Sequence, residues 1–322
     1  MMSFIGALPG AISQGLIWGI MAIGVYITYK ILDVADLTVD GSFCTGGATF
    51  VVLFGAGVNV WVAMLAALLV GMLAGLVTGL LHTFCGIPAI LAGILTQLGL
   101  WSVNLAIMGM KANVAFNIIE QTEEGANNLS RLLVALRFVQ GVGKGDYPFW
   151  RHPIFVVGLF TLGVIAILYW FFGTELGASL RATGANPNMA RAQGINTDVN
   201  TVLGLMISNG LVALSGALLS QYQSFADSSM GKGAIVIGLA AVIIGEVLFS
   251  KVFRNFALKL LAVSLGAIIY YIVIQAVVSL SGINTNYLKL ISAIIVAVFL
   301  AVPYWRGKYF AKSAKKEAAV NA

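Results

Sequence analysis

Residues 60 to 82 read VWVAMLAALLVGMLAGLVTGLLH and contain no Asp, Glu, Lys or Arg. The hydrocarbon core of a bilayer is about 30 Å thick, so a helix of roughly 20 apolar residues can cross it. Gly71, Gly75 and Gly79 recur every fourth residue, a spacing that lets a second helix pack closely. The segment therefore predicts a transmembrane helix with one tightly packed face.

Similar apolar segments recur along the chain and predict an all-α, polytopic membrane helical bundle. Only 9% of the 322 residues are charged, whereas soluble domains carry about 25%. Strands of membrane β-barrels alternate apolar and polar residues, but the apolar runs here are continuous. We expect eight or nine spans, from the segments 11–31, 42–53, 60–82, 87–110, 153–172, 201–221, 234–249, 256–280 and 287–304. They form one membrane domain over residues 1–304, followed by a basic tail over residues 305–322.

Two of these segments, 42–53 and 234–249, are typical of short broken or re-entrant helices. Each follows a polar entry that combines an acid, Ser or Thr, and paired glycines, from Asp36 to Gly47 and from Asp227 to Gly238. Broken helices repeated in two halves mark transport pathways, so an internal duplication is one interpretation. If residues 42–53 do not cross the membrane, eight spans remain and both chain ends lie inside. Nine spans place the N-terminus outside.

Basic residues set the expected orientation, because cytoplasmic loops carry an excess of Lys and Arg. The tail is cytoplasmic in this interpretation, and its charges suit an anionic lipid surface better than nucleic acid: Arg306, Lys308, Lys312, Lys315 and Lys316. The loop 174–197 then lies in the cytoplasm. The loop 111–152 lies outside the cell and includes an amphipathic, interfacial segment over 127–139.

The cytoplasmic loop contains a short polar segment with its own helix signals. Asn186 can cap free N–H groups, and Pro187 suits the first helical position. Gly194 can end the helix in a left-handed conformation. These signals predict a helix over residues 187–193, about 10 Å long. Such a helix is either a docking element for another protein or part of a solvated loop.

The sequence contains no nucleotide-binding or metal-binding motif. The glycine-rich run from Gly141 to Asp146 lacks the G-x-x-x-x-G-K-[ST] spacing of a phosphate-binding loop. His82 and His152 are far apart in sequence, and Cys44 and Cys85 fall at apolar segments, so neither pair predicts a metal site or a disulfide. We therefore expect no enzyme activity and no cofactor in this chain. ATP and Mg²⁺, if used, would bind to a partner chain.

Six residues near the two broken helices are candidates for lining a substrate path: Asp40, Ser42, Phe43, Tyr222, Phe225 and Asp227. The two acids precede the apolar parts of the broken helices. Each acid is either an N-terminal cap, Asp40 for the segment that starts at Gly41, or a group that faces the substrate. The two roles can coexist.

Glu246 is the notable charged residue inside a predicted span. Charged groups at membrane depth are costly and are candidates for function by default. One interpretation makes Glu246 a proton-coupling carboxylate. The other places it near the inner surface, in an ion pair with Lys251 or Arg254.

Three motifs resemble one known family. The pattern Leu180-Arg181-Ala182-x-Gly184-x-Asn186-x-x-x-Ala190-Arg191-x-x-Gly194-Ile195-Asn196 resembles the cytoplasmic loop of ABC importer permeases of the branched-chain amino acid and ribose type. The runs Asp36-Leu37-Thr38-Val39-Asp40-Gly41-Ser42 and Ile237 to Glu246 are similar to the branch with tryptophan- and amino-acid-type permeases. Sugar-type members commonly have Gly where Glu246 stands, so the resemblance does not transfer sugar specificity.

The resemblance implies a permease subunit in the bacterial cytoplasmic (inner) membrane that forms the path for a small solute, an amino acid. Two permease copies, forming a homodimer, and two ATP-binding subunits make up the core, and an extracytoplasmic solute-binding protein delivers the substrate. The loop helix would dock in a groove of the ATPase through Arg181, Gly184, Asn186, Pro187, Met189, Ala190, Arg191 and Gly194. Arg181 and Arg191 would meet acidic groups there, and Met189 and Ala190 would fill the groove.

Two other functions stay open at the level of sequence. A proton-coupled secondary transporter would use Glu246, and uptake by vesicles that hold a proton gradient but no ATPase would favour it. A membrane scaffold or a channel is the other possibility. Neighbouring genes for an ATPase and a binding protein would favour the importer over both.

Overall fold

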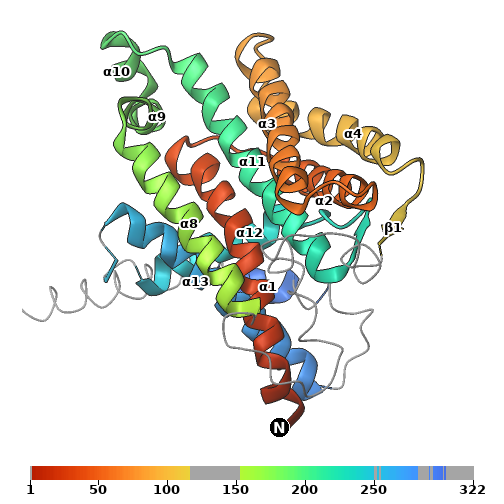
Figure 1. Ribbon diagram of the computed structural model, residues 1–322. Coiled ribbons are helices and arrows are strands. Elements are labelled where there is room, and N and C mark those ends of the chain that lie inside the picture. Colours follow the sequence, from red (N-terminus) through yellow and green to blue (C-terminus); the bar gives the residue numbers. More distant parts are fainter. Residues whose placement is uncertain are drawn as a thin grey trace, which may run out of the picture.

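The protein is a bundle of membrane helices (Figure 1). The computed structural model describes residues 2–116, 153–249, 252–253, 255–281, 290, 293–299 and 301. Six of the described helices are long and apolar enough to cross a bilayer. Together with the shorter apolar helices, they confirm the predicted polytopic helical bundle.

The elements follow the predicted spans, except that α1 begins at Met2, nine residues before the predicted start at residue 11. In chain order they are α1 (Met2–Tyr26), η1 (Ile27–Ile31), α2 (Val39–Gly55), α3 (Val60–Thr83), α4 (Ala89–Ile107), β1 (Asn113–Ala115), α8 (Pro153–Gly173), α9 (Glu175–Ala185), α10 (Pro187–Ala192), α11 (Thr197–Gln223), β2 (Phe225–Asp227), α12 (Ala234–Phe249) and α13 (Phe256–Ser281). The expected interfacial segment 127–139 and tail 305–322 lie outside the described residues. In the last predicted span, only residues 290, 293–299 and 301 are described, and they are helical.

Helices α1 and α11 are mostly buried, whereas α3 shows how an outer helix meets lipid on one side and protein on the other. Leu65, Leu69 and Leu73 follow helical spacing and are more than half exposed. On the other face, a Cβ on Gly75 would overlap the carbonyl of Leu205 in α11. A methyl group added at Gly75 would therefore push α3 and α11 apart, which confirms the predicted close packing.

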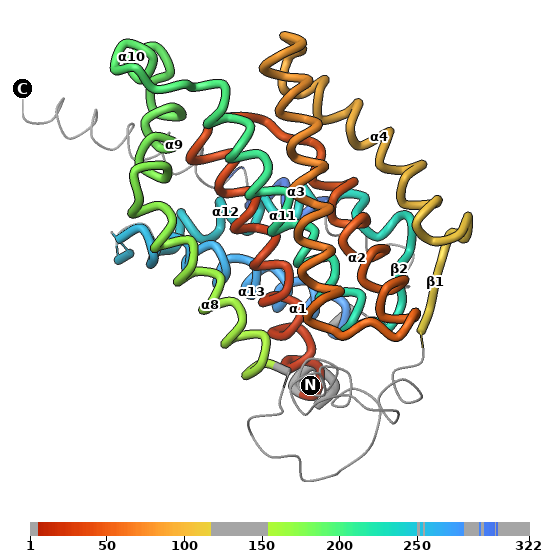
Figure 2. Tube along the Cα trace, turned by 45° about the horizontal axis from the view of Figure 1, so that its top comes forward, coloured from red at the N-terminus to blue at the C-terminus, as the bar shows by residue number. Residues whose placement is uncertain are grey.

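The two halves of the chain exchange partners. Helix α1 packs against α12 and α13 of the second half, and α11 packs against α2 and α3 of the first half. Gly15 and Gly19 of α1 lie against Ile268 and Ser264 of α13, as the glycines of α3 lie against α11. The short helices α2 and α12 lie in comparable places (Figure 2). Helix α2 packs against central α11 and outer α3 and α4, and α12 packs against central α1 and outer α13.

The chain path shows that the segment containing α2 crosses the bundle. Gly184 of α9 lies against the carbonyl of Ile31, so η1 ends on the side of α9 and α10. Gly79, near the end of α3, lies against Val202, near the start of α11, on that same side. Since α3 ends there, it begins at the opposite side, and residues 32–59 connect the two sides. The start of α1 also lies at the end opposite to α10 (Figure 1), as in the nine-span arrangement.

Candidate functional site

A pair of short helices, α9 and α10, projects at one end of the bundle (Figure 1). The local signals for α10 act as predicted: Asn186 Oδ1 accepts from the Met189 N–H at 3.1 Å, and Pro187 is the first helical residue. Gly194 has φ +80°, the left-handed conformation expected at a helix end. The helix ends at Ala192, one residue before the predicted end.

Helix α9 was not predicted, although its N-terminal signal is present in the sequence. The Thr174 side chain accepts from the Gly177 N–H, and Glu175 lies in the first turn, where a negative charge is favourable. The loop 174–197 is therefore a helix pair in which α9 connects α8 to α10.

The predicted coupling residues do not all face outward. Arg181, Asn186, Pro187 and Arg191 are exposed, and Met189 is 55% exposed. Ala190 is only 1% exposed, so the expectation that it forms part of a contact surface is wrong. It packs inside the chain because the turn at Gly194 folds residues 195–197 back over it, with the Ile195 N–H donating to the Ala190 carbonyl at 3.0 Å.

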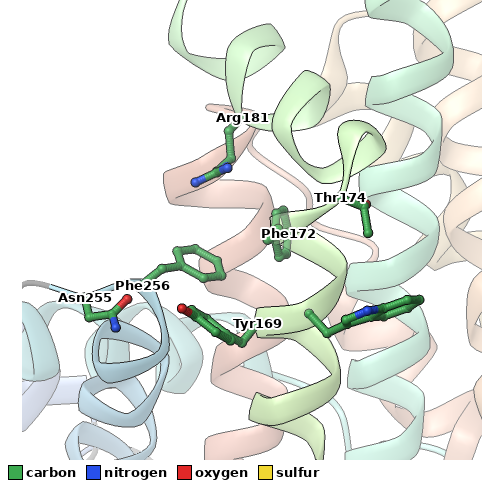
Figure 3. Close-up of a pocket in the computed structure, with 8 residues that line it drawn as sticks. Tyr169, Phe172, Thr174, Arg181, Asn255 and Phe256 are labelled. Atoms are coloured by element: carbon green, nitrogen blue, oxygen red, sulfur yellow. The ribbon is translucent and has the colours of Figure 1, made fainter.

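The two arginines have different surroundings. Arg191 Nε donates to Thr197 Oγ1 at 2.7 Å, and its Nη2 lies 3.2 Å from Asp198 Oδ1. Arg181 instead lines a cavity of about 500 Å³ between α8, α9 and the start of α13 (Figure 3). Tyr169, Phe172 and Phe256 form aromatic walls of this cavity.

A second group of residues lies inside the bundle, where α2 and α12 begin. Of the two roles that the sequence left open for Asp40, a cap for its own helix is not the one seen, because Asp40 caps α12 instead. Its Oδ2 accepts from the Gly233 N–H at 2.8 Å, and its Oδ1 accepts from the Ile235 N–H at 3.0 Å. A carboxylate at this place neutralises the positive end of the α12 dipole. The starts of the two short helices are thereby joined.

A buried hydrogen-bond network surrounds this junction. Asp36 accepts from the Thr38 N–H at 2.9 Å and from Asn209 Nδ2 at 2.7 Å. Ser42 Oγ donates to Asn209 Oδ1 at 2.7 Å, and the Thr38 and Thr78 hydroxyls lie 2.7 Å apart. Asn209 and Thr78 were not singled out in the sequence, because their partners are distant along the chain.

The candidate path residues fall into a packed group and a more open group. Ser42 and Phe43 are fully buried, Tyr222 is 4% exposed, and Phe43 stacks on Trp18 with 4.8 Å between ring centroids. Phe225 and Asp227 lie half-buried in β2, which pairs with β1 in antiparallel register. A role for all six residues in a substrate path stays a prediction.

Asp227 is held by its neighbours in the connection between α11 and α12. Its Oδ1 accepts from the amide of Ser229 at 2.7 Å and also from the Ser229 hydroxyl. Partial burial acts to raise the pKa of Asp227, but these hydrogen bonds, the Asn113 side chain and the charge of Lys232 outweigh burial and lower that pKa. Asp227 is therefore ionised at neutral pH.

A cavity of about 330 Å³ opens beside the junction. It is lined by Asp40, Gly41, Cys44, Gln97, Leu98, Trp101, Asn104, Ser228 and Lys232. Lys232 Nζ lies 4.4 Å from the centroid of the Trp101 ring. Except for Asp40, none of these residues was among the predicted site residues. The sequence signal that could have pointed to this cavity was Lys232, a charged residue between two glycines just before the apolar helix α12.

Glu246 forms an ion pair with a residue that the sequence did not suggest. Its carboxylate lies 3.2 Å from Lys30 Nζ, and both side chains are more than a third exposed. Lys251 and Arg254, the expected partners, lie outside the described residues. The structure pairs Glu246 with Lys30 of η1, which ties η1 to the end of α12, and the pairing with Lys251 or Arg254 stays a prediction.

Comparison with known proteins identifies the family. Residues 8–302 match the model of the family described as branched-chain amino acid transport system / permease component. The chain belongs to this permease family. The matched range includes the α9–α10 pair and the cavity, so both sites lie within the part of the chain that the family shares.

Relatives of the permease have been named for amino-acid and other solutes. It is 40% identical over 289 residues to a tyrosine transport system permease of Clostridioides difficile, which covers 90% of this chain and 88% of the relative. It is 32% identical to an uncharacterized protein of Rickettsia prowazekii, over 90% of this chain and 95% of that protein. An autoinducer 2 import system permease of Salmonella typhimurium is 26% identical over 61% of this chain and 50% of that protein. No solved structure matches the chain.

Proposed function

We propose that this permease is the membrane subunit of an ATP-driven importer in the bacterial cytoplasmic membrane, and that it carries a small solute, an amino acid. A separate ATP-binding subunit docks on α9 and α10, an extracytoplasmic solute-binding protein delivers the substrate, and two permease copies form the path. The α10 side and the C-terminus are cytoplasmic. The exposed α9–α10 pair, with its rigid attachment to the bundle, carries this proposal. The permease named for tyrosine supports the substrate class.

The attachment of α9 to the bundle suits it for transmitting motion. Leu180 is fully buried, and Asn200 of α11 donates to Thr183 Oγ1 at 3.0 Å. Gly184 lies against the carbonyl of Ile31, so α9 contacts η1 without an intervening side chain. A displacement of α10 by the ATPase therefore reaches α11 and η1 directly. A switch of this kind needs a stiff element with different contacts in the two states.

ATP hydrolysis belongs to the partner in this proposal, because the sequence has no phosphate-binding loop with Mg²⁺-binding Ser or Thr. The ATPase supplies ATP and Mg²⁺ binding. The permease supplies the docking surface, where Met189 is the exposed apolar side chain of α10.

The position of Lys232 in its cavity is an argument for the second permease copy in this proposal. Trp101 lies 12 residues after Ala89, the first residue of α4, which places it about 18 Å into this span. Lys232 lies over Trp101 and is exposed, so its charge is at membrane depth. Charged groups at that depth face a water-filled space or another protein surface. A path between two copies provides both.

Met189→Asp tests docking, with Met110→Asp as the matched control. Met110 is 76% exposed. It follows α4, which starts at the α10 side, so Met110 lies at the other end of this span and away from α10. An unpaired carboxylate in a docked groove costs about 2 kcal/mol or more, so ATPase co-purification with Met189→Asp should fall by at least about ten-fold. Met110→Asp should assemble normally.

Assembly and substrate-stimulated ATP hydrolysis are measured on the same purified complexes. Normal assembly and stimulation with Met189→Asp would refute docking through α10. Equal loss in both variants would show a general effect of the added charge and would also count against the proposal.

A further inference from the structure

The cavity beside α4 contains two polar groups that no salt bridge or hydrogen bond satisfies in the described part of the chain, although the charge of Lys232 also acts on Asp227 from beyond salt-bridge distance. The first is the Lys232 ammonium. Within the described part of the chain, no carboxylate lies within salt-bridge distance of its Nζ, which sits over the Trp101 ring. The nearby carboxylates are engaged, Asp40 by two N–H groups of α12 and Asp227 by Ser229. Lys232 is therefore available to an anionic group that enters the cavity.

The second group is the carbonyl oxygen of Asn104. Asn104 is 1% exposed, and its Nδ2 donates to the Gly41 carbonyl at 3.3 Å. Its Oδ1 has no hydrogen-bond donor among the described residues. A buried acceptor without a partner costs about 1–3 kcal/mol, so a donor from outside the chain would relieve this cost. The most favourable donor is a cationic N–H group.

The remaining lining is suited to an apolar body. Trp101 and Leu98 of α4 provide a flat ring and an aliphatic side chain. The cavity of about 330 Å³ is at the lower end of the range of roughly 300–1,000 Å³ for small-molecule sites, enough for one small solute. The lining thus combines a cation, an acceptor and an apolar wall.

We propose that this cavity binds a free zwitterionic amino acid during transport. Lys232 Nζ pairs with the α-carboxylate, Asn104 Oδ1 accepts from the α-ammonium, and the substrate side chain lies against Trp101. This assignment rests on the proposed function, and it places the recognition of both charged groups inside the permease. Asp40 belongs to the floor of the same cavity and fixes its shape through α12.

The test uses the permease–ATPase complex in lipid nanodiscs without binding protein, so that only sites in the complex are probed. Binding is measured by saturation-transfer NMR with L-tyrosine as the probe. Tyramine, which lacks the carboxylate, and 3-(4-hydroxyphenyl)propionate, which lacks the ammonium, are the comparison molecules. L-Tyrosine should bind at least about ten-fold more tightly than either, because each loses one charge-assisted hydrogen bond.

Lys232→Gln should weaken L-tyrosine binding by about ten-fold and leave tyramine binding unchanged. Lys232→Arg should restore much of the loss. Lys259→Gln, at an exposed lysine of α13, is the matched control. Trp101→Leu should weaken all three molecules, whereas Trp170→Leu, at a 71% exposed position of α8, should not.

Equal binding of the three probe molecules, no binding of L-tyrosine, or unchanged binding by Lys232→Gln would each overturn the site. ATP hydrolysis stimulated by the loaded binding protein is measured in parallel. If that stimulation is normal while the cavity variants have no effect, the site is refuted and the importer stands. If stimulation and assembly fail in the unmodified complex, the proposed function itself is refuted.

Discussion

At the scale of single residues, a helix cap comes either from a neighbour in the sequence or from a distant part of the fold. Asn186, Pro187 and Gly194 shape α10 as expected because a helix cap involves neighbours within a few residues. The sequence left open whether Asp40 caps its own helix or faces the substrate. In the structure it caps α12, whose Gly233 N–H is 193 residues away in sequence. No local pattern contains that information, since it depends on how the two halves pack.

The first prediction concerns the cap that Asp40 provides. Asp40→Asn removes the charge opposite the α12 N-terminus and one of two good acceptors, which should destabilise the protein by about 1–2 kcal/mol. Asp33→Asn is the control, because Asp33 is exposed and Asn tolerates its φ of +56°. Thermal unfolding of the purified permease in detergent measures the difference. Equal midpoints for the two variants would contradict the capping role.

At the scale of elements, the long apolar helices were predicted to within a few residues because length and hydropathy define a membrane span. The exception is α1, which begins at Met2 and not at residue 11. Helix α9 was missed because it is short and polar, and Gly177 and Gly184 lower its helix propensity. Those glycines are required by contacts that only the fold reveals, with the carbonyls of Phe171 and Ile31. Ala190 was misassigned for the same reason, since its burial depends on the turn that follows α10.

The second prediction concerns the packing of α3 on α11. Gly75→Ala places a methyl group against the carbonyl of Leu205, a backbone atom that cannot rotate away, so stability should fall by about 1–3 kcal/mol. Gly99→Ala in α4 has open space around the new methyl and should be neutral or slightly stabilising. Thermal unfolding of both variants measures this contrast. A neutral result for Gly75→Ala would show that α3 and α11 are not in tight contact.

At the scale of the whole molecule, composition was enough to predict a polytopic membrane bundle, but not the cavity. The cavity combines α2, α4 and residues 228–232, which come from both halves. Trp101, Asn104 and Lys232 acquire their chemistry from this combination. The exchange of partners between α1 and α11 was equally out of reach, because it is a property of two halves together.

The third prediction separates an ATP-driven importer from a proton-coupled transporter. Glu246 and Lys30 form a partly exposed ion pair, and such pairs contribute about 0–1 kcal/mol. Glu246→Gln should therefore leave ATP-dependent uptake within about two-fold of the unmodified complex, with a small loss of stability at most. Uptake is measured in proteoliposomes with ATP and no proton gradient.

Loss of uptake by Glu246→Gln, together with uptake driven by a proton gradient alone, would establish the proton-coupled alternative. Lys30→Gln serves as the second variant. If the pair is structural, the double variant should be no less stable than either single variant.

The cap between α2 and α12 also has a consequence for synthesis. Ribosomes add about 5–20 residues per second, so the Gly233 N–H follows Asp40 by roughly 10–40 seconds. During that interval Asp40 lacks the N–H partners of α12 that it has in the finished protein. The nascent chain must shelter this group in water, in the insertion machinery or by protonation. Once the second half has been made, the N–H groups of α12 take over this role, so the first half reaches its final structure only together with the second.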